Sequence, residues 1–248
     1  MNKFPHLSKA PIVEGVLDFR VSQRPDFKVE TLKLAEAKLP EGYRLIKPQK
    51  GYAGHIFFGP DAAPQQAVHD LGITGYVLHS ADDRYVAQFR RDGVSLSRLA
   101  PYTSWEDVFE KAVSFWRLYV ETAAPVEVER IAVRTINRIT LIEGVTELAA
   151  YLTAPPPLPP GIPTRVRTFL SQNLVEDEET GIRANVIQTI EPPEAMDKRA
   201  IILDSDVFLT RKFDPKDDRL LETFESLRKL KNVIFFNSLR PEIIERYK

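Results

Sequence analysis

The amino-acid sequence predicts an α+β protein in which a curved antiparallel sheet carries helices on one face. Three observations lead to this prediction. Apolar and polar residues alternate over several segments, as they do in strands that bury one face. Two long segments place apolar residues at helical spacing. The order strand, short helix, strand meander and long helix occurs twice within the 248 residues.

The first half begins with a strand over residues 12–21, where apolar residues alternate with charged ones. A short amphipathic helix is predicted over 28–39. A meander follows, with strands over residues 52–58, 74–80, 84–91 and 94–99. The pair Asp92-Gly93 between the last two strands is the strongest short signal for a hairpin. Ser104 then caps a long helix that extends to about residue 121 and buries an aromatic stripe.

The second half repeats this order. A long strand is predicted over residues 126–141, and a short helix over 145–152 follows it. Further strands are predicted over residues 164–174, 183–190 and 200–208. Asp214-Pro215 is the predicted start of the second long helix, because Asp favours the cap and Pro the first helical position. A last short helix over 241–247 completes the chain.

The repeated order predicts how the two halves, residues 1–124 and 125–248, assemble. Two such halves would merge into one globular unit with a continuous antiparallel sheet and helices on one face. The opposite face would be open and curved by the twist of the sheet. This is the saddle arrangement of the TATA-binding-protein-like fold. We expect it here on topology alone, which carries no function with it.

Composition excludes several classes of protein. The absence of cysteine excludes disulfide scaffolds, Cys-ligated zinc and thiol nucleophiles. Lys and Arg number 34 against 35 Asp and Glu, so the chain lacks the basic excess of a protein that binds mainly phosphates. No apolar run approaches the roughly 18 residues that span a bilayer, and the N-terminus lacks a secretion signal. We therefore expect a cytoplasmic protein with no membrane partner.

Catalytic signatures are missing from the sequence. It contains no Gly-x-Ser-x-Gly, Walker A, Gly-x-Gly-x-x-Gly or His-Glu-x-x-His motif. The histidines, which form no pair at the spacing of metal ligands, are His6, His55, His69 and His79. We therefore predict no catalytic residue, no metal site and no cofactor. The sequence favours a non-enzymatic binding or regulatory module.

Charged residues of like parity mark the expected open face. Arg130, Arg134 and Arg138 share one side of their strand at spacings of about 13 Å. Acidic residues share the corresponding side of two other strands. The candidate binding residues are Arg130, Arg134, Arg138, Asp18, Asp204 and Asp206.

Two interpretations of these charges stay open. They form either a cross-strand ion ladder that keeps the face soluble or a cradle whose guanidinium groups bind an anion. The ladder is favoured, because surface ion pairs are common. A cradle predicts that charge reversal at Arg134 abolishes binding and leaves stability unchanged; a ladder predicts a large loss of stability.

Other functions remain as alternatives. The same face could bind a nucleic acid or nucleotide, although the balanced charge does not favour this. Asp204 and Asp206 could form part of a metal-dependent hydrolase, but neutralisation by arginine is favoured over a metal. An exposed strand edge or sheet face would also allow two copies to form a homodimer. The ligand or protein partner itself is not indicated.

Four stretches of the sequence resemble a known family. They are Ala10-Pro11-Ile12-Val13-Glu14, the residues 129–139 (ERIAVRTINRI), the residues 203–208 (LDSDVF) and the residues 227–247. Their order is similar to that in a sporadically distributed bacterial family of proteins of about 250 residues with no assigned activity. The family's middle motif is closer to E-R-x-G-L-R-Y-x-N-R-I, so Ala132 and Thr135 depart from it. The resemblance implies a standalone cytoplasmic protein and supplies no catalytic residue.

Overall fold

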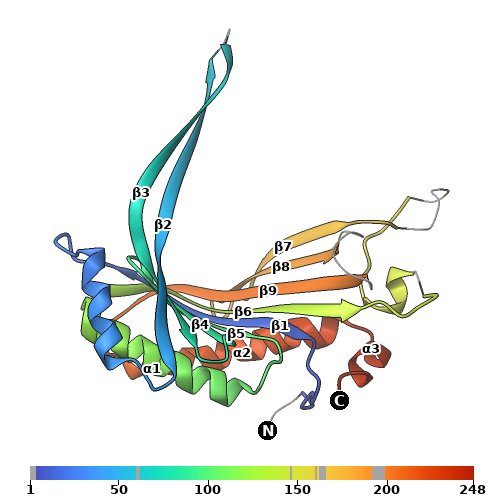
Figure 1. The fold of residues 1–248 in the computed structure, drawn as a ribbon. Helices are drawn as coiled ribbons and strands as arrows, with labels where there is room; N and C mark the ends of the chain where they lie inside the picture. Colours follow the sequence, from blue (N-terminus) through green and yellow to red (C-terminus); the bar gives the residue numbers. More distant parts are fainter. Residues whose placement is uncertain (1–3, 60–61, 146, 160, 162–165, 192–198) are drawn as a thin grey trace.

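The computed structural model describes the chain except for residues 1–3, 60–61, 146, 160, 162–165 and 192–198. Within the described residues, nine strands form one antiparallel sheet in the order β2-β3-β4-β5-β1-β6-β9-β8-β7 (Figure 1). The strands are β1 (Ile12–Ser22), β2 (Tyr43–Gly59), β3 (Ala62–Ser80), β4 (Tyr85–Arg90), β5 (Gly93–Leu99), β6 (Glu127–Thr140), β7 (Leu170–Glu176), β8 (Arg183–Ile190) and β9 (Ala200–Phe213). The helices are α1 (Trp105–Ala123), α2 (Asp218–Ser238), α3 (Pro241–Glu245) and the 3-10 segments η1 (Val29–Lys38) and η2 (Leu148–Ala150). The α+β class and the open antiparallel sheet are confirmed.

The centre of the sheet joins the two halves of the chain. β1 pairs with β6 in antiparallel register, from Ile12 opposite Asn137 to Ser22 opposite Glu127. The strands from residues 1–124 lie on one side of this pair and those from residues 125–248 on the other. One continuous sheet therefore contains strands of both halves.

The two long helices cover one face of the sheet. α1 packs on β1 and β5, and α2 packs on β6 and β9; both helices lie below the sheet in Figure 1. Phe19 of β1 stacks on Trp116 of α1 with ring centroids 4.6 Å apart and meets Phe224 of α2 at 5.0 Å. All three side chains are buried. The apolar side of β1 thus anchors both helices, as the alternation in the sequence predicts.

The short helices and one helix start differ from prediction. The segments predicted as helices over 28–39 and 145–152 form only the 3-10 segments η1 and η2. The N-cap of α2 is Asp217, whose carboxylate accepts a hydrogen bond from the Arg219 amide, and not Asp214. Asp214 lies three residues before this cap. Its carboxylate accepts a hydrogen bond from the Lys216 amide, which closes a turn before the helix. Two Asp residues within four positions both satisfy the capping pattern, and the later one is used.

The hairpin and the cap of the first long helix agree with prediction. Asp92-Gly93 joins β4 to β5, and Gly93 has a φ of 141°. A Cβ atom at Gly93 would lie 1.9 Å from the Phe19 carbonyl oxygen, so only glycine fits there. The Ser104 hydroxyl accepts a hydrogen bond from the Asp107 amide and caps α1.

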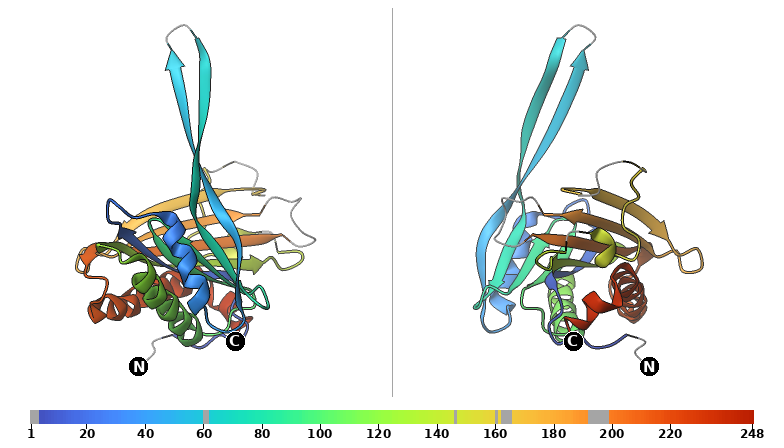
Figure 2. Two further views of the ribbon diagram at one scale, coloured as in Figure 1. Left: turned by 60° about the vertical axis from the view of Figure 1, so that its left-hand side comes forward. Right: turned by 90° about the vertical axis from the view of Figure 1, so that its right-hand side faces the viewer.

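β2 and β3 are much longer than predicted and form an arm. They pair from Tyr43 opposite Ser80 out to Gly59 opposite Ala62. β4 pairs with β3 only over residues 75–79, so the part beyond pairs only with itself. This two-stranded arm projects away from the helix layer in every view (Figures 1 and 2). At the opposite edge, β7 begins at Leu170, and of the strand predicted over 164–174 the residues 164–165 lie outside the described residues.

Candidate functional site

The helix-free face of the sheet carries the charged residues predicted from the sequence. Arg130, Arg134 and Arg138 lie on β6, Asp204 and Asp206 on β9, and Asp18 on β1. Across the three central strands, Val16 lies opposite Arg134, which lies opposite Asp206. The like-parity residues of the sequence are therefore neighbours on one surface.

Asp18 is the centre of this surface. Its carboxylate accepts hydrogen bonds from Arg90 Nη2 at 2.5 Å, Arg20 Nε at 3.0 Å and Arg130 Nη1 at 3.4 Å. Arg20 and Arg90 were not among the predicted residues; they come from β1 and β4. Their parity within those strands is the same as that of the predicted set. Three guanidinium groups on one largely buried carboxylate make a network and not an isolated pair.

Each arginine of β6 is bound to a carboxylate. Arg134 binds Asp204 through two nitrogens, Nε at 2.8 Å and Nη2 at 2.5 Å. These bonds to Asp204 raise the pKa of Arg134 against the opposing effect of its burial. The Asp204 side chain is only 12% exposed. Asp204 thus depends on one guanidinium for its counter-charge.

Arg130 bridges two of the strands. In addition to Asp18, it binds Asp206 through Nη2 at 2.7 Å, and its guanidinium lies 4.4 Å from the centre of the Phe208 ring. Burial raises the pKa of Asp206, although Arg130 and Arg134 act to lower it. Asp206 is therefore a desolvated carboxylate that its two arginines only partly compensate.

Arg138 lies apart from the other predicted residues. Its partner is Glu191, just after β8, with Nη2 2.7 Å from Oε2. The structure thus brings five of the six predicted residues together on one surface, with Asp18, Arg130 and Asp206 in one network and the Arg134–Asp204 pair beside it, and places Arg138 in a further ion pair along β6. Every arginine of the row has a carboxylate partner, which is the arrangement expected of the ion ladder.

A hollow of about 520 Å³ lies over the network. Its lining includes Glu14, Asp18, Arg90, Arg130, Arg134 and Asp206. Glu14 has no ion pair within the described part of the chain, so the hollow has one unpaired acidic group. Leu170 and Leu174 of β7, which are 71% and 66% exposed, lie across the outer strands on the same side of the sheet. The helix-free face is thus charged at its centre and apolar at the β7 edge.

The described residues contain no group of three or more His, Asp or Glu side chains suited to a metal ion. Asp204 and Asp206, the predicted alternative, are each bound by an arginine. A cation at this position would have to displace Arg134 or Arg130.

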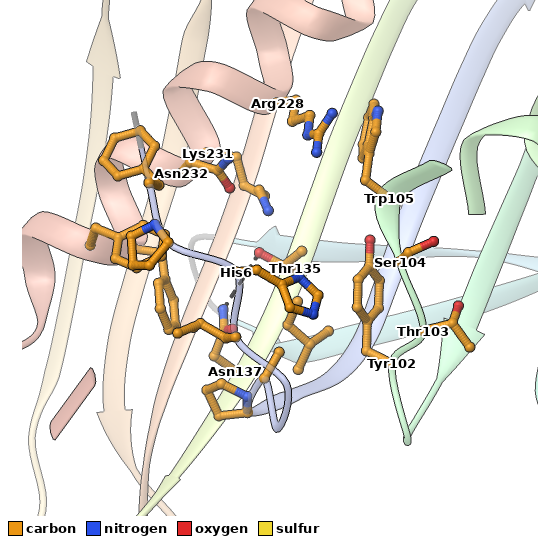
Figure 3. A pocket seen from close by; sticks show the side chains of 18 of the residues that line it. His6, Tyr102, Thr103, Ser104, Trp105, Thr135, Asn137, Arg228, Lys231 and Asn232 are labelled. Carbon is orange, nitrogen blue, oxygen red and sulfur yellow. Dashed lines mark hydrogen bonds between the residues drawn. The ribbon is translucent and has the colours of Figure 1, made fainter. Parts of the chain in front are cut away.

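A second candidate site, which sequence reasoning missed, lies on the helix side of the sheet. It is a pocket of about 170 Å³ between the N-terminal segment, the start of α1, the middle of α2 and strand β6 (Figure 3). Lys231 and Asn232 reach into it from α2, and Tyr102 and His6 reach in from the opposite walls. Thr135 of β6 lies at its base.

Small and polar residues open this pocket beneath the helices. Gly15, Thr135 and Ser205 lie directly opposite one another on β1, β6 and β9, where larger apolar residues would otherwise fill the core. A Cβ atom at Gly15 would lie 2.9 Å from Tyr102 Cε2, so the glycine makes room for the tyrosine ring. Asn137, only 1% exposed, donates to the Leu203 carbonyl oxygen at 3.1 Å. These residues interrupt the packed layer that surrounds them.

The pocket holds a cation without a counter-ion. Lys231 has no hydrogen bond or ion pair within the described residues. Burial, with a smaller contribution from nearby Arg228, lowers the pKa of Lys231 from 10.5 to about 8. Arg228 itself is paired, because Glu106 Oε1 lies 3.1 Å from its Nη2 and the Trp105 ring lies beneath it.

A signal for this pocket exists in the sequence. Over residues 131–141, the odd-numbered residues, which face the helices, are apolar except Thr135 and Asn137. Ser205 interrupts β9 in the same way. Polar residues in the buried row of a strand need partners or a cavity. Lys231 gives no such signal, because a lysine on an amphipathic helix is ordinarily exposed.

Comparison with known proteins gives no family for this chain: no protein-family model matches it, and neither does any curated protein. Among the described residues, none of the helices has the length and apolar character needed to cross a membrane.

Proposed function

We propose that the protein is a non-enzymatic binding module that holds a polypeptide partner on the helix-free face of its sheet. The observation that carries this proposal is the hollow of about 520 Å³ at the centre of that face. The β2–β3 arm rises at one side of it, and the exposed leucines of β7 lie at the other (Figure 1). An extended surface with a charged centre and an apolar edge suits another protein chain better than a small molecule.

The charges of the hollow favour a partner that carries both signs. Its arginines are already bound to Asp18, Asp204 and Asp206, so little positive charge is left for phosphates. Glu14 and the outward surface of Arg134, whose side chain is 46% exposed, offer one group of each sign. A polypeptide with a basic and an acidic side chain would complement them.

We infer further that the two halves of the chain are structural repeats that form a TATA-binding-protein-like saddle. The strand order supports this inference. Outward from the central β1–β6 pair, each half contributes first its last strand, β5 or β9, then β4 or β8. Each half also ends in a long helix on the same face. The arm of β2 and β3 and the shorter second half are departures from exact repetition.

Site-specific photo-crosslinking in cells that express the protein tests the proposed partner. A photoreactive residue at Leu170 is placed on the helix-free face, and one at Glu222, exposed on α2, is the matched control on the helix side. We expect one discrete protein adduct from position 170 and none from position 222. The adducted protein is then purified, and its affinity for the wild type is compared with that for a Leu170→Asp, Leu174→Asp variant, which should bind at least about tenfold more weakly.

Other results would contradict the proposal. Equal adducts from both positions, or no adduct from position 170, would show that this face binds no specific protein. An adduct with a second copy of the chain would replace the proposed partner by self-association. The proposal would be replaced by nucleic-acid binding if a nucleic acid inhibited formation of the adduct and its affinity for the protein fell steeply as the salt concentration rose.

A further inference from the structure

We propose that the pocket between the N-terminal segment, α1, α2 and β6 is a binding site for a small carboxylate, whose anion pairs with Lys231. This site lies on the side of the sheet opposite the proposed partner surface, so neither proposal depends on the other. Its volume, about 170 Å³, suits a molecule little larger than a benzene ring.

Lys231 lacks a counter-ion within the described residues. The nearest charged side chain that affects it is another cation, Arg228. An ammonium that is partly removed from water and has no partner is unfavourable. Folded proteins tolerate such a group where a ligand supplies the opposite charge.

The acidic groups near Lys231 bind other partners. Glu106 lines the pocket, but its carboxylate is bound to Arg228 at 3.1 Å. Glu225 is also occupied, because it accepts from the indole nitrogen of Trp105 at 2.9 Å. Both carboxylates are largely exposed and bind these other groups, and neither forms an ion pair with Lys231.

The pocket also contains further hydrogen-bond donors and apolar walls. The Tyr102 hydroxyl has no hydrogen bond within the described residues and, like Lys231, reaches into the pocket (Figure 3). The first turn of α1, which begins at Trp105, presents the positive end of a long helix to the same space. Trp105 and Phe235 supply apolar surface for a ring or short chain. One cation, one hydroxyl and apolar walls match a monocarboxylate better than a phosphate, which carries more charge and needs more donors.

Titration with three probes tests the site. Benzoate is the anionic probe, benzamide is its neutral analogue, and inorganic phosphate is the competing anion. Trp105 lies in the pocket wall, so its fluorescence reports occupancy, and isothermal calorimetry provides a second measurement. We expect saturable benzoate binding with a dissociation constant below about 10 mM and binding of benzamide weaker by at least about tenfold.

Two lysine variants separate the site from general surface charge. Lys231→Met should weaken benzoate binding at least about tenfold, whereas Lys229→Met, an exposed lysine of the same helix outside the pocket, should leave it unchanged. Tyr102→Phe should weaken it by a smaller factor. If Lys231→Met fails to fold, the comparison of benzoate with benzamide binding to the wild type still shows whether the pocket requires an anionic ligand.

The proposal is overturned if benzoate shows no saturable binding, if benzamide binds equally well, or if folded Lys231→Met binds benzoate like the wild type. Binding of phosphate without binding of benzoate would overturn the assignment of a carboxylate.

Discussion

The two faces of the sheet differ in whether their partly or fully buried charged side chains have a partner of opposite charge. Asp18 and Asp204 are mostly buried and each binds guanidinium partners, whereas the half-buried Lys231 has no ion-pair partner within the described residues. The first situation is stable because each charge is compensated, and removal of one partner is then costly. The second leaves an unpaired charge, which the proposed carboxylate would compensate.

Arg134→Met is expected to lower the free energy of unfolding by about 1–3 kcal/mol, because Asp204 keeps its buried position and loses its counter-charge. Arg134→Glu should cost more, since it places a third carboxylate beside Asp204 and Asp206. Lys212→Met is the control. Lys212 pairs with Glu127 on the same strands but is 78% exposed, and its loss should cost less than about 0.5 kcal/mol.

Chemical denaturation of the three variants measures these differences. Equal stability of Arg134→Met and Lys212→Met would show that the ion ladder contributes nothing. The double variant Arg134→Met, Asp204→Leu should regain much of the loss, because it removes both charges together.

Lys231 predicts a rise of stability with pH. Its pKa is about 8 in the folded protein and 10.5 in the unfolded chain, so the unfolded chain binds more protons between these values. The free energy of unfolding of the wild type, relative to Lys231→Met, should therefore rise by about 1–3 kcal/mol from pH 8 to 10.5 and stay constant below pH 8. The groups that face Lys231 are Arg228 on α2, Glu106 on α1, and Tyr102 and His6 on the opposite walls.

Of these neighbours, Tyr102 does not ionise in that window, because burial raises its pKa. Denaturant curves at several pH values provide the measurement. Lys229 lies on the same helix but is exposed, so the free energy of unfolding of Lys229→Met should depend on pH as that of the wild type does. The same pH dependence in Lys231→Met and the wild type would contradict the prediction.

Residue parity could be predicted from the sequence, but ion-pair partners could not. Alternation placed the arginines of β6 on the helix-free face, as found. Which carboxylate each one binds depends on side-chain reach across strands: Arg134 lies opposite Asp206 yet binds Asp204, two positions along. Glu191 follows a strand and shares no pattern with Arg138, so nothing in the sequence joins them.

At the scale of elements, local signals predicted best where local physics decides. The Asp92-Gly93 hairpin and the Ser104 cap depend on a few adjacent residues, and both were correct. The arm was underestimated for the opposite reason. Residues 52–58 gave the only strand signal in β2, whereas residues 43–50 pair with residues 73–80 and residues 62–70 form the second strand of the outer arm, so the extent of this pairing depends on long-range register.

The arm is expected to contribute to binding and little to folding. Replacement of residues 52–70 by an Asn-Gly turn removes only strand pairs that no third strand supports. The thermal midpoint should change by less than about 3 °C, while the adduct from a photoreactive group at Leu170 should be lost or much reduced. A loss of cooperative unfolding would contradict this division, and so would an unchanged adduct with an unchanged midpoint.

At the scale of the whole molecule, one sheet with helices on one face could be predicted from the order of elements, and its pocket could not. The sheet follows from two halves that each need an apolar face covered. The pocket requires Tyr102, Thr135 and Lys231, which are distant in sequence, to meet, with the Tyr102 ring placed against Gly15. Only three-dimensional packing determines such a pocket, because no single segment contains it.

Strand β6 is the shared wall of the two sides. Arg134 and Thr135 are consecutive, yet one belongs to the charged hollow and the other to the pocket under the helices. A single backbone therefore separates the two compartments. If a carboxylate bound in the pocket displaces β6, Arg134 moves with the strand and the affinity of the hollow for its partner changes. Thermodynamic linkage then requires the partner to change the affinity of the pocket for the carboxylate by the same factor.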